Sequence, residues 1–211
     1  IYQNMSFLDD TRNFGLIMLI LGLVAAISAV VSIVDSFGNE MHDIVLHVGS
    51  LIFGLMILTF GLAIRGGKVL LFSSLYDQGV DSKFGVLATF VTILGAASLI
   101  LGVLGVVNHF LPGSETLASG AGNIVVGIIL LIVAMLMKDG DTNILDKIIW
   151  IVLAIIFIIG IIVSFISIFG VFDGEAIQII LALVLAISRT LMFLMLFVYL
   201  ISDEVKAKMG M

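Results

Sequence analysis

The stretch Phe14–Asp35, FGLIMLILGLVAAISAVVSIVD, decides the fold class of this protein. It carries no charged side chain before its last residue, Asp35. A helix needs about 20 predominantly apolar residues to cross roughly 30 Å of hydrocarbon. The stretch is therefore expected to form a membrane-spanning helix.

Five further stretches share this character. The six expected spans are 14–35, 44–64, 84–107, 121–137, 147–171 and 176–201. The chain is 62% hydrophobic and 11% charged, with a mean hydropathy of +1.34, whereas soluble domains are about 25% charged. Its 211 residues hold six spans and short loops, so we expect one integral membrane domain over 1–211. The apolar segment 69–76 is too short to span and is expected to lie along the membrane interface.

Composition excludes several classes of function. The chain has no cysteine, which rules out disulfides, thiolate metal sites and thiol catalysis. A net charge of −6 argues against a nucleic-acid partner, which needs basic patches. No phosphate-binding glycine loop and no convincing Ser-His-acid order is present, so we expect neither an enzyme nor a cofactor. Residues 1–13 lack a basic stretch before an apolar core, so the first span is expected to be retained.

The basic residues indicate how the chain is oriented. The loops on one side contain Arg12, Arg65, Lys68, Lys83, Lys138, Lys147, Lys206 and Lys208. The loops on the other side contain no Lys or Arg but hold Asp35, Glu40, Asp43, Glu115, Asp173 and Glu175. Short loops rich in Lys and Arg stay in the cytoplasm. We therefore expect a cell-membrane protein with both termini cytoplasmic and its acidic loops outside.

The sequence also repeats weakly. A shift of 73 residues places Gly22 on Gly95 and Gly54 on Gly127, and a further shift of 65 places Gly95 on Gly160. The third copy loses register in its second helix. The pattern predicts three helical hairpins, at about 14–65, 84–138 and 147–201.

Small residues form a stripe on the first helix of each hairpin. The stripes are Gly22, Ala25, Ala29 and Ser32; Gly95, Ser98, Gly102 and Gly105; and Gly160, Ser167 and Gly170. Their spacing keeps each stripe on one helix face, and small residues let helices approach closely in lipid. We expect the first, third and fifth spans to pack together through these stripes. The result would be a pseudo-threefold bundle with a dry centre and the even-numbered spans outside.

The chain is divided into three two-helix units, and each opens with a Leu-Gly or Ile-Gly pair such as Leu21-Gly22 and Leu94-Gly95. In this it resembles the HdeD-like acid-resistance membrane proteins. Short outer loops and a glycine in the return helix, Gly54 and Gly127, add to the likeness. The resemblance covers residues 14–201 and implies an architecture of three hairpins. It implies no catalytic residue.

Arg189, with its neighbours Ser188 and Thr190, is the first candidate for function. It lies near the middle of the last span, where a charged side chain costs roughly 2.5–3.5 kcal/mol on insertion scales. No Asp or Glu lies inside any expected span to pair with it. The arginine either lines an anion or proton pathway, anchors another subunit, or snorkels toward the headgroups.

Two weaker candidates lie at the acidic side. His42, Asp43, His47 and His109 are residue types that bind a divalent transition metal, although no tight ligand motif joins them. Asp35, Asn108 and Asp173 end the three stripes and would form a polar ring at the outer mouth of a threefold bundle. For both groups, helix capping and a solvated acidic rim are the simpler interpretation.

These observations favour a non-enzymatic membrane protein, acting as a structural or accessory subunit of a membrane assembly. Its partners would be the lipid bilayer and other membrane subunits or copies of itself. The alternative is a small transporter or channel for protons, anions or metal ions. Arg189 is central to both interpretations, as an anchor in the first and as a pathway residue in the second.

Overall fold

The computed structural model describes the chain except for residues 1–6, 38–40, 77–78, 112–116, 141 and 171–175. Its long helices are α1 Thr11–Ser36, α2 Met41–Ile64, α4 Lys83–His109, α5 Leu117–Lys138, α6 Ile144–Phe169 and α7 Ala176–Leu200. The short ones are η1 Phe7–Asp9, α3 Ser73–Tyr76 and α8 Asp203–Lys208. The six long helices are each long and apolar enough to cross a membrane, so the predicted six-span membrane fold is confirmed at this level.

Polar side chains start three of these helices. Asp10 accepts a hydrogen bond from the backbone N–H of Arg12 at the start of α1. Ser82 accepts one from Gly85 at the start of α4. Asn143 and Asp146 form a reciprocal capping box at the start of α6. Each cap satisfies N–H groups that have no partner within the helix.

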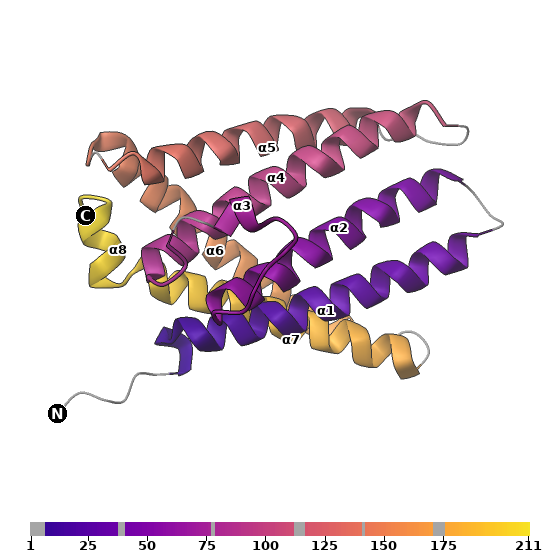
Figure 1. Cartoon of the computed structure of the whole chain (residues 1–211), viewed down its shortest axis with the longest axis horizontal. Helices are drawn as coiled ribbons and strands as arrows, with labels where there is room; N and C mark the ends of the chain where they lie inside the picture. Colours follow the sequence, from indigo (N-terminus) through magenta and orange to yellow (C-terminus); the bar gives the residue numbers. More distant parts are fainter. Residues whose placement is uncertain (1–6, 38–40, 77–78, 112–116, 141, 171–175) are drawn as a thin grey trace.

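The helices pack mainly in consecutive antiparallel pairs, α1 with α2, α4 with α5, and α6 with α7 (Figure 1). One end of the bundle carries the helix starts near Arg12, Lys83 and Lys147, and we call it the basic end. The opposite end, which carries Asp35 and Asp43, is called the acidic end. Between pairs, α2 packs on α4 and α1 packs on α7, while α4 with α7 and α5 with α6 meet less extensively.

This packing differs from the predicted bundle. The first, third and fifth spans are α1, α4 and α6, and they do not pack together. The prediction that these three spans meet at the centre is therefore wrong. The even-numbered spans are not the outer ones either. In the 18-residue apolar windows of the helices, α2 is as buried as α4, at 39% of the residues, and α6 is less buried than α5 or α7, at 17% against 22% and 28%.

The second stripe packs inside its own hairpin, whereas in the first stripe Gly22 does so and Ala25, Ala29 and Ser32 border a cavity. A Cβ added at Gly22 would lie 2.3 Å from the backbone nitrogen of Leu58, and one at Gly95 would lie 3.0 Å from that of Leu131. The return helices contribute Gly54 and Gly127. A Cβ added at Gly54 would lie 2.8 Å from the backbone nitrogen of Ala26, and one added at Gly127 would lie 2.8 Å from that of Leu99. The contacts of Gly95 with Leu131 and of Gly127 with Leu99 lie 73 positions after the contacts of Gly22 with Leu58 and of Gly54 with Ala26. Close backbone approach therefore joins α1 to α2 and α4 to α5.

The third stripe behaves differently. Gly160 faces the ring of Phe193 on α7, with 2.7 Å from an added Cβ to Cδ1. Ser167 and Gly170 are exposed and do not contribute to a buried seam. An aromatic ring thus stands between α6 and α7 where glycine and backbone meet in the other hairpins.

The hydrophobic core lies in the half of the bundle nearest the basic end. Phe14 packs edge-on against Tyr199 with ring centroids 5.6 Å apart, and against Phe60 at 6.2 Å. The Tyr199 hydroxyl donates to the carbonyl of Asp10 over 3.0 Å, and Glu204 of α8 accepts from the N–H of Phe84 over 3.2 Å. An ion pair between Lys83 and Asp9 joins α4 to η1. These contacts close the bundle at its basic end.

The segment 69–76 follows α2 and ends in the single turn of α3. The hydroxyl of Tyr76 donates to the carbonyl of Met56 over 2.9 Å and lies 2.7 Å from the hydroxyl of Thr59. Met56 is about 12 Å from the end of α2 at 1.5 Å per residue, so the segment reaches back along the side of the bundle. Leu70 is 94% exposed. The expected position at a membrane interface stays a prediction.

Candidate ligand cavity at Arg189

A cavity of about 730 Å³ lies between the packed basic end and the acidic end. Residues of α1, α2, α4, α6 and α7 line it. Its volume is in the range of small-molecule binding sites, about 300–1,000 Å³. The prediction of a closely packed centre is therefore wrong, and the prediction that the centre is dry stays a prediction.

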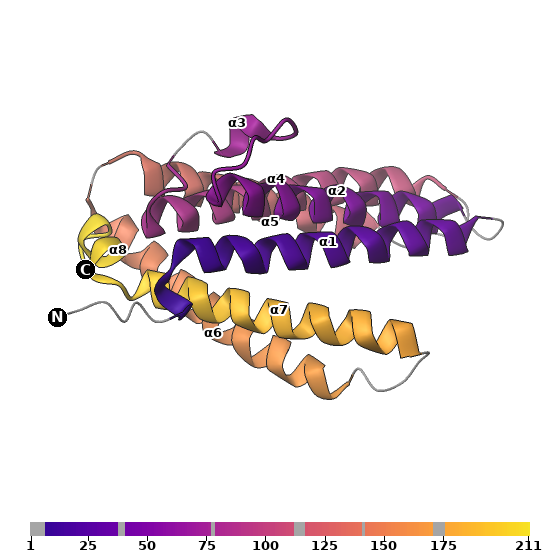
Figure 2. The same cartoon turned by 60° about the horizontal axis from the view of Figure 1, so that its bottom comes forward.

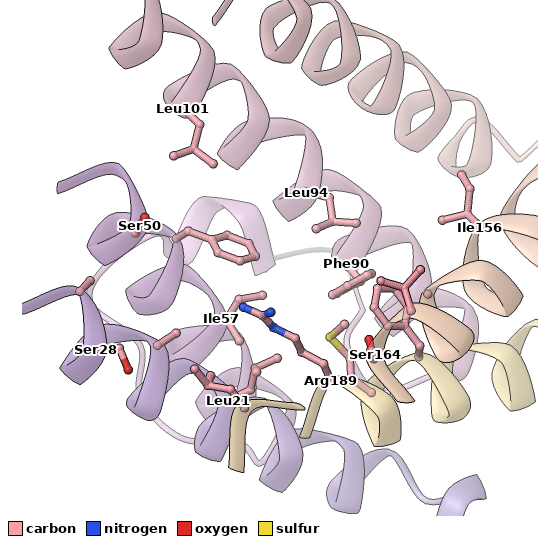
Figure 3. Close-up of a pocket in the computed structure, with 18 of the residues that line it drawn as sticks. Leu21, Ser28, Ser50, Ile57, Phe90, Leu94, Leu101, Ile156, Ser164 and Arg189 are labelled. Atoms are coloured by element: carbon pink, nitrogen blue, oxygen red, sulfur yellow. The ribbon is translucent and has the colours of Figure 1, made fainter. Parts of the chain in front are cut away.

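Arg189 extends into this cavity from α7. Figure 3 shows its guanidinium group pointing toward Ile57 of α2. The residue is about 16 Å from the end of α7 at Leu200, at 1.5 Å per residue. Among the described residues, no acidic group or hydrogen-bond acceptor pairs with it. The guanidinium is thus an exposed cation within the cavity.

The neighbours of Arg189 do not hold it. Ser188 is buried and does not line the cavity. The hydroxyl of Thr190 donates to the carbonyl of Ala186 over 2.9 Å, inside α7. The hydroxyls of Ser188 and Thr190, which the sequence suggested as partners, therefore do not bind the Arg189 guanidinium.

The walls of the cavity differ in polarity. The wall formed by α1 and α2, which we call the polar wall, carries most of the polar lining residues. These are Ser28, Ser32, His47 and Ser50, and they lie among the apolar Leu21, Ala25, Ala29, Phe53 and Ile57. The wall formed by α4 and α6 is apolar apart from Ser164, and consists of Phe90, Leu94, Leu101, Ile156, Ile159, Gly160 and Val163. Figure 3 shows Ser28 and Ser50 on one side of the guanidinium and Leu94 and Ile156 away from them. The cavity is therefore amphipathic, with a single cation between its polar and apolar parts.

The apolar wall is interrupted between α4 and α6, which do not pack on each other. Ile156, Ile159 and Val163 of α6 line the cavity and are also 40%, 54% and 59% exposed. Figure 2 shows the α6–α7 pair diverging from α1 toward the acidic end. We infer that the cavity opens sideways at this gap, toward the surface that the apolar spans present to their surroundings. We call the opening between α4 and α6 the side portal.

The candidate metal ligands are not gathered. Among the residues that the structure describes, no three His, Asp or Glu side chains come together as a metal site. His47 lies in the cavity wall, whereas His109 has its ring against Phe110 with centroids 5.6 Å apart. The side chain of His42 lies outside the described part, and Asp43 belongs to no metal-like group there.

The predicted polar ring at the acidic end is not formed as expected. Asp35 is exposed, whereas Asn108 is fully buried. Asp173 lies outside the described residues. The two described members thus occupy different environments and do not share an open mouth.

Sequence reasoning identified Arg189 from its lone charge but missed the cavity around it. A usable signal was present, because Ser28 and Ser32 are four residues apart and His47 and Ser50 three apart. Each spacing places two polar side chains on one face of an apolar helix. The comparisons with known proteins add no assignment: no family model, no curated protein and no solved structure matches the chain.

Proposed function

We propose that this protein is a small membrane transporter that binds an anion at Arg189. The observation that supports it is the guanidinium without a partner among the described residues, exposed in a cavity of about 730 Å³. Charged side chains at mid-membrane depth are costly and usually mark substrate or ion pathways. A cavity lined by apolar groups with few polar ones is the usual form of a ligand site.

The chemistry of the site favours an anion over the other ions that a transporter might carry. An arginine side chain keeps its proton in proteins, so it does not relay protons. A guanidinium repels metal cations and binds carboxylate, sulfonate or phosphate through two parallel hydrogen bonds. The cavity therefore suits a ligand with an acidic group and an apolar body.

The charge of the loops supports an orientation for this transporter. With the basic end in the cytoplasm, as the excess of Lys and Arg favours, the closed core would face the cytoplasm and the cavity would lie in the outer half. The protein would then be in an outward-facing state. Movement of an anion to the cytoplasm would require the contacts at the basic end, such as Tyr199 to Asp10, to open.

The glycine contacts of the first hairpin recur 73 residues later in the second, which supports an origin of these two hairpins by duplication. The role of an accessory subunit, expected in part from a tightly packing interior stripe, loses that one argument because the centre holds a cavity. In that role an acidic side chain of another subunit would occupy the place that we assign to the anion.

The test is uptake by liposomes that contain the full chain. The probe is radiolabelled p-toluenesulfonate, which has an apolar ring and a permanent charge and therefore crosses lipid slowly by itself. Arg189→Gln keeps the length and polarity of the side chain but removes its charge. The matched control is Arg65→Gln, because Arg65 is an exposed cation just after the end of α2, and its guanidinium donates to the Arg12 carbonyl over 3.3 Å.

We expect uptake to fall at least tenfold in Arg189→Gln, as a loss of about 1.4 kcal/mol of binding would produce, and to stay unchanged in Arg65→Gln. Equal uptake by wild type and Arg189→Gln would contradict the proposal. If Arg189 instead anchors a subunit, Arg189→Leu should shift the complex to smaller size in mild detergent.

A further inference from the structure

The division of the cavity into a polar wall and an open apolar wall indicates the class of anion, and this step rests on the proposed function. We infer that the ligand is a membrane lipid with an anionic headgroup, which enters through the side portal. Its headgroup contacts the wall formed by α1 and α2 and its acidic group binds Arg189. Its acyl chains stay between α4 and α6, in continuity with the bilayer.

The polar wall provides a path for a headgroup. Ser32 lies about 6 Å from the end of α1, and Arg189 lies about 20 Å from the start of α7, at 1.5 Å per residue. Ser28, His47 and Ser50 belong to the same lining on α1 and α2. A headgroup that descends from the acidic end therefore meets hydroxyl and imidazole groups before it reaches the guanidinium.

The apolar wall argues against a small hydrated anion. Fifteen of the cavity's lining residues are Ala, Gly, Ile, Leu, Met, Phe or Val, and Arg189 is their only cationic neighbour in the lining. An inorganic anion would lose its water here and find few donors to replace it, which is costly. A lipid brings only its headgroup to the polar wall and presents chains to the apolar wall.

The side portal accounts for the way in. Ile156, Ile159 and Val163 line the cavity and are exposed at the same time. In a membrane their exposed surface meets acyl chains, because these residues lie in the interior of a spanning helix. A chain can thus pass between α4 and α6 without leaving an apolar environment.

Selection between lipids should come from the headgroup. Acyl chains are about as apolar as the Leu and Ile side chains of the wall, so their transfer from the bilayer gains little. The charge of Arg189 discriminates between anionic and zwitterionic headgroups. Chain length should therefore have a weak effect and headgroup charge a strong one.

The inference can be tested with the full chain in nanodiscs of phosphatidylcholine. The probe is phosphatidylglycerol with a photoactivatable diazirine in one chain, and the comparison probe is phosphatidylcholine with the same chain. After illumination, peptide mapping should locate the phosphatidylglycerol adducts at the side portal, on Leu94 and Ile159. Adducts there should fall at least tenfold in Arg189→Gln, equivalent to about 1.4 kcal/mol, and remain in Arg65→Gln.

A second pair of variants tests the portal itself. Ile159→Trp places a large side chain at the opening, whereas Ile158→Trp places one on the neighbouring exposed residue, which does not line the cavity. Both sites are exposed, so neither change disturbs the core. Ile159→Trp should reduce the phosphatidylglycerol adducts on Leu94, and Ile158→Trp should not.

The outcomes separate this inference from the proposed function. Equal labelling of the side portal by the two probes, or labelling that ignores Arg189, would overturn the lipid assignment. If p-toluenesulfonate uptake still depends on Arg189 in that case, the site takes a water-soluble anion and only the lipid assignment fails. If p-toluenesulfonate uptake does not depend on Arg189, the proposed function fails as well.

Discussion

Replacing Gly22 by Ala tests whether close backbone approach holds the first hairpin together. The added Cβ would lie 2.3 Å from the backbone nitrogen of Leu58 and 2.6 Å from its Cα, whereas ordinary contacts begin at 3.4 Å. The obstacle is backbone, so it cannot rotate away. Helices α1 and α2 must therefore separate by about 1 Å, a distance that forfeits much of the dispersion energy along their seam.

The magnitude follows from two opposing effects. Overpacking of a well-packed interior costs about 1–3 kcal/mol, while alanine in a helix is favoured over glycine by up to about 1 kcal/mol. Because the obstacle is backbone, we take the overpacking cost from the upper part of its range, about 2–3 kcal/mol, and the net loss in the free energy of unfolding is then about 1–2 kcal/mol. For a chain of this size that corresponds to a fall in Tm of about 2–8 °C.

The assay is thermal unfolding followed by circular dichroism in one detergent. The control is Gly122→Ala on α5, because a Cβ there meets nothing within 4 Å. Gly160→Ala should have an intermediate effect, since its obstacle is the ring of Phe193, which can shift. The packing argument is refuted if Gly22→Ala and Gly122→Ala unfold at the same temperature.

Two further predictions concern the basic end and the segment before α4. Asp9→Asn removes the ion pair with Lys83, in which the Lys83 side chain is 20% exposed and that of Asp9 34% exposed. We expect the free energy of unfolding of the detergent-solubilised protein to fall by up to about 1 kcal/mol, and this difference to shrink as salt is raised. A loss that does not depend on salt would contradict the prediction. Tyr76→Phe removes the hydroxyl that bonds Met56 and Thr59 and should cost about 1 kcal/mol of unfolding free energy. Burial raises the pKa of Tyr76 above 10.0, so the unfolded chain ionises first and stability is lost as the pH rises above that value. The Tyr76→Phe variant should therefore lose less stability than wild type in unfolding measurements across that range, and an identical pH profile would show that the tyrosine is not buried.

The sequence was sufficient to identify the spans, although the expected starts at 14, 84 and 147 compare with observed starts at 11, 83 and 144. Runs such as Phe14–Val34 contain no charged residue, and a single segment satisfies its own backbone hydrogen bonds in lipid when it is a helix. Asp10, Ser82 and Asn143 precede helices α1, α4 and α6 as N-caps, which local chemistry explains. These features depend on residues close together in the chain.

Helix partners could not be predicted in the same way. A spanning helix lacks the contrast between an apolar and a polar face that directs packing in water, so its sequence does not show which face is buried. The glycine stripes did indicate close approach, but not to what. Gly22 and Gly95 meet the helix that follows in the chain, and Gly160 meets the ring of Phe193.

The sequence by itself determined that the protein has six apolar helices, that basic and acidic loops alternate, and that one arginine lies within a span. Only the tertiary structure decided that α1, α4 and α6 stay apart, that the core fills one half of the bundle and that Arg189 faces a cavity with a polar and an apolar wall. The reason is physical: span length and charge are properties of a continuous segment. A cavity arises instead where side chains from five separate helices fail to fill the space between them.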